Sequence, residues 1–393
     1  MSAVSYFHWN QSELLKCTEP RSAFLYFSTY RLNLLTGHYE ATGIDRLWRE
    51  LAEINITDFK QSPYVIHFYF EAGFYLHGMK DHLQEETPLA MVLDYGEGHF
   101  VSKKRFKKPT TQLELKYLQG PLFSDYKKQF EEVYRHLLNG DCYQINLTHP
   151  FEYFYEKTHS SDDWLNHFFS SEKISPYAHA TYIQDSEQLI LSNSPECLVQ
   201  KSQRGDEIFT MPIKGTIRFK DNNESLKIWN TLKNSIKDEN ELFMITDLLR
   251  NDLNFLSGGK SCVRALKKPL HVPGLLHQYS VISAPLKPFQ DLYSTLLGIF
   301  PGGSITGAPK KRVMEYIHQI EMNPRGLYCG STLLMYEKFC GLNINIRTAD
   351  ISLLDRHLKL GAGGGVTLKS KPSEEFLEMK FKAESFLTLF SRP

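Results

Sequence analysis

The chain has 393 residues, of which 41% are hydrophobic, and its 45 basic side chains balance 45 acidic ones. This balance gives no overall field that would attract nucleic acid or an anionic membrane, so neither partner is expected. Six scattered cysteines without a Cys-x-x-Cys pair favour reduced thiols in the cytoplasm over a disulfide framework or a zinc site. No stretch is apolar and long enough to predict a membrane span or a signal peptide.

The N-terminal third is the least informative part of the sequence. Residues 64–79 are rich in aromatic and β-branched side chains with Gly73 near the middle, which predicts two paired strands. We therefore expect a sheet lobe over residues 1–120, intertwined with a catalytic region over residues 121–393. The basic run 103–108, which ends at Pro109, is typical of a solvated connector rather than a docking patch.

Strands and helices interleave after residue 120 without the regular spacing of β-α-β units. Apolar residues at helical spacing predict helices, and runs with alternating or β-branched residues predict strands. The predicted helices span 124–138, 223–253 and 374–389, and the predicted strands span 142–147 and 187–199. A Gly-rich turn after Phe300, followed by Pro309, predicts the start of another helix that reaches Glu321.

Three charged residues share one face of the last predicted helix. Glu375, Glu378 and Lys382 stand at positions i, i+3 and i+7, a pattern that ordinarily marks a solvated salt-bridge ladder. Directly before this helix lies Gly361–Gly365, predicted as a loop whose backbone N–H groups can surround an anion because no side chain blocks its approach. The glycines lack the spacing of the dinucleotide and P-loop motifs, so they do not indicate a nucleotide site.

Another carboxylate, Glu241, lies in the long predicted helix, where the simplest interpretation is a polar surface position. Two glutamates from distant helices could instead hold a hard cation. Mg²⁺ typically takes one or two carboxylates, several waters and an oxygen of the substrate. A substrate that carries a carboxylate would complete such a site.

Ten segments in chain order identify a family. They are 142–147, Ser194-Pro195-Glu196, Pro212-Ile213-Lys214-Gly215-Thr216, Glu241 with the run 247–252, His277, 303–310, 328–331, 346–348, 361–365 and 375–382. Together they resemble the chorismate-utilising enzymes, which include anthranilate, aminodeoxychorismate, isochorismate and salicylate synthases, over roughly residues 120–390. The resemblance implies an α+β fold in which two large antiparallel β-sheets pack face to face, with helices outside and the active site in a cleft.

The resemblance also implies roles for individual residues. Glu241 and Glu378 resemble the family's Mg²⁺ ligands, with Glu375 close by, and the ion would hold the ring carboxylate of chorismate. Arg347 and Tyr328 resemble the residues that hold the enolpyruvyl carboxylate, for which a planar guanidinium can form a bidentate pair. The full set of expected substrate contacts is Tyr328, Arg347, Gly363, Gly364, Gly365, Thr306 and Lys382. His277 resembles the histidine that faces the ring near C4.

Lys214 distinguishes among members of this family. Anthranilate and isochorismate synthases typically have alanine there, which leaves room for direct attack at C2. A lysine resembles the aminodeoxychorismate synthases, in which its amine adds at C2 as the C4 hydroxyl departs, and ammonia then attacks C4 and expels the lysine. A covalent intermediate splits one displacement into two, provided that the amine is unprotonated. Glu196 resembles the carboxylate that protonates the departing hydroxyl and later takes a proton from ammonia.

Partners and alternatives follow from the same resemblance. We expect ammonia from a separate glutamine amidotransferase subunit, because the sequence contains no Gly-x-Cys-x-Gly nucleophile turn. A sibling reaction, such as anthranilate or isochorismate synthesis, stays open although Lys214 argues against it. A non-catalytic chorismate-binding subunit also stays open. The N-terminal lobe could carry a tryptophan pocket, as in related synthases, for which Ser28 and Pro176-Tyr177 are the candidate residues.

Overall fold

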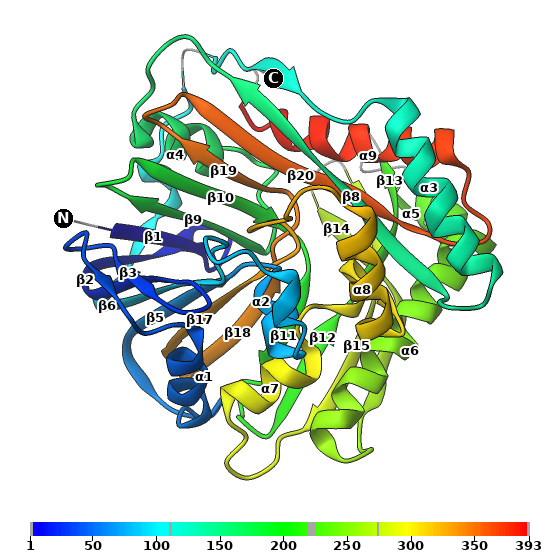
Figure 1. The fold of residues 1–393 in the computed structure, drawn as a ribbon, viewed down its shortest axis with the longest axis horizontal. Coiled ribbons are helices and arrows are strands. Elements are labelled where there is room, and N and C mark those ends of the chain that lie inside the picture. The colour runs from blue at the N-terminus through cyan, green and yellow to red at the C-terminus, as the bar shows by residue number, and fades with distance from the viewer. Residues whose placement is uncertain (1–2, 110–111, 219–224, 273–274, 391–393) are drawn as a thin grey trace.

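The computed structural model describes residues 3–109, 112–218, 225–272 and 275–390, and antiparallel strands dominate it (Figure 1). The strands form two layers. The first layer pairs in the order β7 (Lys116–Gln119), β8 (Gln144–Phe154), β20 (His357–Val366), β19 (Thr348–Ser352), β10 (Gln188–Ser194), β9 (Tyr177–Ile183) and β1 (Ala3–His8). The short strand β16 (Gly307–Ala308) also pairs with β8.

The second layer continues from β1 through its pairing with β2. Its order is β2 (Glu13–Tyr26), β6 (Ala90–Ser102), β5 (Lys60–Phe68), β17 (Ser331–Glu337), β18 (Phe339–Ile344), β11 (Cys197–Lys201), β12 (Glu207–Met211), β15 (Leu275–Pro285) and β14 (Cys262–Val272). The strand β13 (Ile213–Arg218) pairs with β15, and β3 (Arg31–Asn33) and β4 (Tyr39–Glu40) extend from β2.

Side chains show that the two layers face each other. His67 on β5 lies 2.9 Å from the Thr181 hydroxyl on β9, and the Thr332 hydroxyl on β17 lies 3.1 Å from His179 on β9. These strands are distant in the pairing order, so the sheet must fold back on itself to bring them into contact. The expected face-to-face arrangement is confirmed. The β1–β2 pairing adds that both layers belong to one hydrogen-bonded system.

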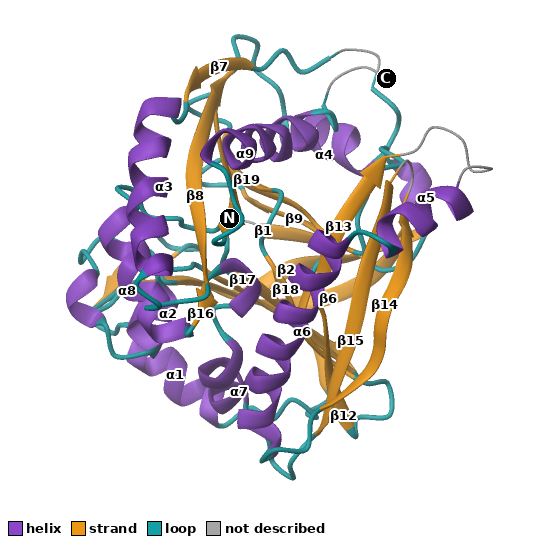
Figure 2. Ribbon diagram, turned by 90° about the vertical axis from the view of Figure 1, so that its right-hand side faces the viewer, coloured by secondary structure: helices purple, strands orange, loops and turns teal. Residues whose placement is uncertain are grey.

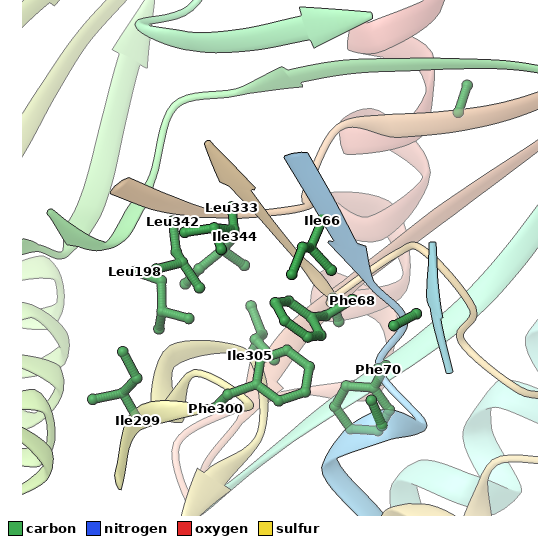
Figure 3. Close-up of a cluster of buried hydrophobic side chains, with 14 of the residues drawn as sticks. Ile66, Phe68, Phe70, Leu198, Ile299, Phe300, Ile305, Leu333, Leu342 and Ile344 are labelled. Carbon is green, nitrogen blue, oxygen red and sulfur yellow. The ribbon is translucent and has the colours of Figure 1, made fainter. Parts of the chain in front are cut away.

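Helices cover the outside of the layers and the ends of the sheet (Figure 2). They are α1 (Ile44–Ala52), α2 (Ala72–Leu76), α3 (Phe123–Leu138), α4 (Ser161–Phe169), α5 (Ser225–Lys233), α6 (Ile236–Ser257), α7 (Leu292–Ile299), α8 (Lys310–Ile320) and α9 (Pro372–Leu387). Helix α9 packs on β20 and α6 packs on β15. Phe68, Phe300 and Ile305 meet in the apolar core shown in Figure 3. Within the described residues, no helix combines the length and apolarity needed to cross a membrane.

Several predicted elements are confirmed. Helix α3 ends before Gly140, which has φ +75°, and Pro309 is the N-cap of α8. The basic run forms a mostly exposed connector after β6, and all six cysteines are free. Strands from residues 1–120 pair with later ones, as β1 does with β9 and β5 with β17. The boundary at residue 120 stays a prediction.

Three local predictions are wrong. Residues 64–79 form the end of β5 and then α2, not two strands, and the Glu71 carboxyl group just before α2 accepts the backbone N–H groups of Arg325 and Gly326. The predicted strand 187–199 is two strands, interrupted at Pro195. The predicted helix 223–253, whose first two residues lie outside the described ranges, is divided after Lys233, because Ser235 caps a new helix by accepting from the Asp238 N–H.

Candidate active site

Lys214 lies on β13 opposite Gln278 of β15. The register then slips at Gly215, so that Thr216 lies opposite His277. Gly215 has φ +76°, and a Cβ there would come within 2.9 Å of Leu232, so a side chain would be both strained and crowded. This bulge fixes the relative positions of Lys214 and His277.

Glu196 lies next to Lys214, one residue before β11. Its backbone carbonyl accepts the Ile344 N–H at 3.0 Å, and its side chain is buried. Burial raises the pKa of Glu196, although the charge of Lys214 and the Ser304 hydroxyl offset part of the effect. A raised pKa favours the protonated carboxyl group, which suits a general acid.

Arg347 and His277 form a second group on the other side of the β13 bulge. Burial lowers the pKa of the Arg347 guanidinium, and no hydrogen bond or ion pair joins that group to any residue that the structure describes. Burial and the nearby Arg347 charge lower the pKa of His277 to about 4, so its imidazole is neutral at pH 7. A buried cation without a counter-charge is a strong attractor for a carboxylate.

The glycine segment 361–365 lies beside Arg347, and the prediction that it is a loop is wrong. Its residues belong to β20 and pair with β8 along one edge. On the other edge, the last pair with β19 joins Ala349 and Leu360. Strand β19 begins one residue earlier, at Thr348, and Arg347 comes immediately before it. Alternate amides of β20 therefore point to an edge that has no strand partner within the described ranges. Strand geometry, not a loop, presents these N–H groups.

The C-terminal helix places its charged face against this glycine strand. Lys382 Nζ donates to the Gly363 carbonyl at 3.0 Å and lies 2.9 Å from a Glu378 oxygen. Glu375 is buried and accepts the Ser370 hydroxyl at 2.8 Å. A Cβ on Gly364 would lie 3.2 Å from Glu375 Oε2. The expected cluster of α9 groups and β20 glycines is therefore present, rather than an isolated surface ladder.

The proposed metal ligands come from two helices, Glu241 from α6 and Glu375 and Glu378 from α9. Their carboxylate oxygens suit Mg²⁺, which needs only one or two such ligands besides water and substrate. Among the residues with described positions, no group of three or more His, Cys, Asp or Glu side chains is placed to hold an ion. The donor chemistry fits Mg²⁺, and the ion stays a proposal.

Two expected substrate contacts already have structural roles. The buried Thr306 hydroxyl donates to the Gly302 carbonyl at 2.9 Å, and the Thr306 carbonyl accepts the Asn146 N–H at 2.8 Å. The Tyr328 ring lies against Gly361, where a Cβ would come within 2.1 Å of it. Only glycine at position 361 allows this approach.

A buried ion pair next to Tyr328 was not anticipated from the sequence. All three guanidinium nitrogens of Arg325 donate hydrogen bonds. Two of these, of 2.8 Å, go to the Glu321 carboxylate, and two of 2.7 Å go to the backbone carbonyls of Ile305 and Asn146. Arg325 thus joins the end of α8, the 302–306 turn and β8. The local sequence, Asn-Pro-Arg after a helix, indicates only a turn.

Two cavities can be described, and Lys214, Glu196 and Arg347 line neither of them. One of about 580 Å³ is lined by residues that include Tyr328 and Gly361, and its polar wall includes Glu321 and Arg325. The other, of about 520 Å³, opens between the layers and is lined by residues that include Pro176 and Tyr177. Ser28, the third candidate for a tryptophan pocket, does not line the second cavity.

Comparison with known proteins identifies a family that this sequence matches. The model of a family described as chorismate binding enzyme matches residues 12–388. Aminodeoxychorismate synthase component 1 of Klebsiella aerogenes is 36% identical over 268 residues, which cover 67% of this chain and 57% of the relative. Anthranilate synthase component 1 of Saccharolobus solfataricus is 30% identical over 276 residues, covering 67% of this chain and 62% of the relative. The matched segment thus spans less than two thirds of the length of either relative.

Solved structures share the fold. Anthranilate synthase component I from Streptococcus pneumoniae aligns with a TM-score of 0.76 at 19% identity, covering 96% of this chain and 93% of that one. A putative 2,3-dihydroxybenzoate-specific isochorismate synthase from Bacillus anthracis aligns with a TM-score of 0.72 at 16% identity, covering 98% and 96%. At these identities the likeness establishes the architecture alone.

Proposed function

The chain belongs to the chorismate binding enzyme family, and from this premise we propose that it aminates chorismate at C4 to give 4-amino-4-deoxychorismate. The observation that carries the proposal is Lys214 beside the buried Glu196, where the raised pKa of the carboxyl group provides an acid next to an amine nucleophile. The likeness to proteins named aminodeoxychorismate synthase component 1 supports the same reaction.

We propose the following roles for the residues of the site. Arg347, with Tyr328 and the free edge of β20, holds the enolpyruvyl carboxylate. Nζ of Lys214 forms a bond to C2 while the C4 hydroxyl leaves as water, with a proton from Glu196. Ammonia then forms a bond to C4, the C2–Nζ bond breaks with its electrons returning to Lys214, and Glu196 recovers a proton from the new amine. Chorismate and ammonia thus become the aminated product and water.

His277, neutral at pH 7, would face the ring near C4, and Lys382 with Thr306 would border the substrate. Glu241 and Glu378, with Glu375 close by, would hold Mg²⁺, which supplies a positive charge for the ring carboxylate. The relatives are named component 1, which supports the existence of a partner component. We propose that this partner is a glutamine amidotransferase that supplies ammonia. The product would feed 4-aminobenzoate and folate synthesis.

The decisive experiment incubates the purified protein with chorismate, Mg²⁺ and ammonium and identifies products by mass spectrometry. Lys214→Ala should lower C4 amination by roughly 10³-fold, equivalent to about 4 kcal/mol, because the covalent route is lost. Chorismate binding, measured by calorimetry, should be largely kept.

Lys260→Ala, which removes an exposed lysine, is the matched control and should leave the rate unchanged. Anthranilate or isochorismate as the main product of the parent protein would refute C4 amination. Unchanged C4 amination by the Lys214→Ala variant would refute the covalent role of the lysine.

A further inference from the structure

Two polar side chains on β15 are fully buried beside Lys214. Gln278 and Ser280 both have 0% of their surface exposed. Neither amide atom of Gln278, Oε1 or Nε2, has a hydrogen-bond partner in the described part of the chain, and neither does the Ser280 hydroxyl. None of the expected family motifs includes these two residues.

The strand register places both on the same side of the sheet as Lys214. Gln278 is the cross-strand partner of Lys214, and cross-strand partners share a face with Cβ atoms roughly 5 Å apart. Ser280 is two residues further along β15, so it shares that face, and its N–H donates to the Pro212 carbonyl at 3.2 Å.

The strand register also places Glu196 on this face of the sheet. Cys197 pairs with Met211, so one further step places Glu196 opposite Pro212, in the same row as Ser280. Residues in one row across neighbouring strands face the same side. The Oε1 atom of Glu196 is buried and has no partner within hydrogen-bonding distance among the described residues, although the Ser304 hydroxyl is near enough to lower the pKa of the carboxyl group. Three oxygens without a hydrogen-bonded partner in the described part of the chain thus lie on one face around Lys214, with the Ser304 hydroxyl close to Glu196.

Such an arrangement opposes folding. A buried polar group without a partner costs about 1–3 kcal/mol, and an apolar side chain of similar size would avoid that cost. Leucine or methionine at position 278 would fill the same space without unpaired atoms. A small ligand that donates several hydrogen bonds to these oxygens would account for the polar choice.

We propose that Gln278 Oε1, Ser280 Oγ and Glu196 Oε1 form the binding site for the ammonia that attacks C4. This inference rests on the proposed amination. Ammonia has three N–H donors and one lone pair, so three acceptors can hold it with the lone pair free to attack. The lone pair forms the C4–N bond as the C2–Nζ bond to Lys214 breaks, and the proton lost from the new C4 ammonium goes to Glu196. Gln278 and Ser280 lose and gain no proton.

The test measures amination with ammonium chloride as the nitrogen source, at constant pH and ionic strength, in Gln278→Leu, Gln278→Met and Ser280→Ala variants. Both Gln278 variants should raise the KM for ammonium at least tenfold. Their KM for chorismate should change less than twofold. Their thermal unfolding midpoints should equal or exceed that of the parent, because an unpaired amide has been removed. Ser280→Ala should raise the KM for ammonium about threefold or more.

The control is Ser283→Ala, which removes a buried hydroxyl on the opposite face of β15 that is bonded to Arg264. Its KM for ammonium should match that of the parent. An unchanged KM for ammonium in folded Gln278 variants would overturn the ammonia site while leaving C4 amination intact. Amination at C2 in the parent would overturn the proposed function, and the ammonium KM values would still test the site. No amination by the parent would overturn both.

Discussion

Two arginines, the buried Arg325 and the partly buried Arg347, differ in their partners. The Arg325 guanidinium is bonded to Glu321 and to two backbone carbonyls, and it lies 4.3 Å from the centre of the Phe70 ring. Arg347 has none of these contacts to the described residues, and burial lowers its pKa.

This difference distinguishes a charged side chain that stabilises the fold from one that is available to bind a ligand. A buried cation is tolerated when hydrogen bonds and a counter-charge replace water, and it is costly otherwise. Arg325 meets that condition within the chain. Arg347 would meet it only when a carboxylate ligand arrives. The same contrast holds for Gln278, whose amide atoms lack partners, while the His67 ring is bonded to Thr181 and Thr332.

The largest expected effect comes from Arg325→Met. Because Glu321 would be left buried without its partner, the free energy of unfolding should fall by about 3–5 kcal/mol, measured in urea. Adding Glu321→Leu should recover only part of the loss, because the Thr148 N–H and hydroxyl would still lack the acceptor that Glu321 supplies. The control, Arg46→Ala, removes an exposed i, i+4 pair with Glu50 and should cost less than about 0.5 kcal/mol. Equal effects of the two arginine changes would contradict the structural role of Arg325.

A second effect tests the carboxyl group that anchors the Arg325 segment. Burial raises the pKa of Glu71 to about 7, although three backbone N–H groups and the Arg325 charge partly oppose the shift. A raised folded-state pKa stabilises the fold below the unfolded pKa near 4.5, and this stability is lost as pH rises through 7. Between pH 4.5 and 8 the parent should therefore lose on the order of 3 kcal/mol relative to Glu71→Gln. Parallel pH profiles of the two proteins in urea unfolding would contradict this prediction.

The third effect concerns Arg347→Met and should appear in binding, not in stability. Loss of a charge-assisted pair with a carboxylate should raise the KM for chorismate by about 10–100-fold, equivalent to about 1.5–3 kcal/mol. The thermal midpoint without substrate should stay equal or rise, because an unpaired buried charge is removed. Arg347→Lys should keep part of the affinity. A drop in stability as large as that of Arg325→Met would show that Arg347 is structural instead.

Sequence motifs anticipated much of the candidate site because side-chain identity is local information. Motifs alone point to Lys214, Glu196 and Arg347. Gly140 predicts the end of α3, and Pro309 predicts the start of α8. The fold class was inferred from the same resemblance and is confirmed by the facing layers. The roles of the site residues stay predictions.

Other features depended on contacts between distant residues. The glycines of 361–365 are typical of a loop, yet they form a strand because β8, which lies more than 200 positions earlier in the chain, pairs with them. The segment after Phe68 turns into α2, and Glu71 just before this helix accepts the Arg325 N–H, a contact that local propensity does not reveal. Gln278 has an ordinary place in an alternating strand pattern, and only its burial shows that its amide lacks partners.

By itself, the sequence determined which chemical groups the protein carries and to which family it belongs. Tertiary structure decided which of those groups are paired and which are left for a ligand. Pairing depends on burial and on hydrogen-bond partners brought together from distant segments, and neither quantity exists until the chain has folded. Arg325 and Arg347 are the same residue type 22 positions apart in the printed sequence, and the fold alone gives one a counter-charge and leaves the other without.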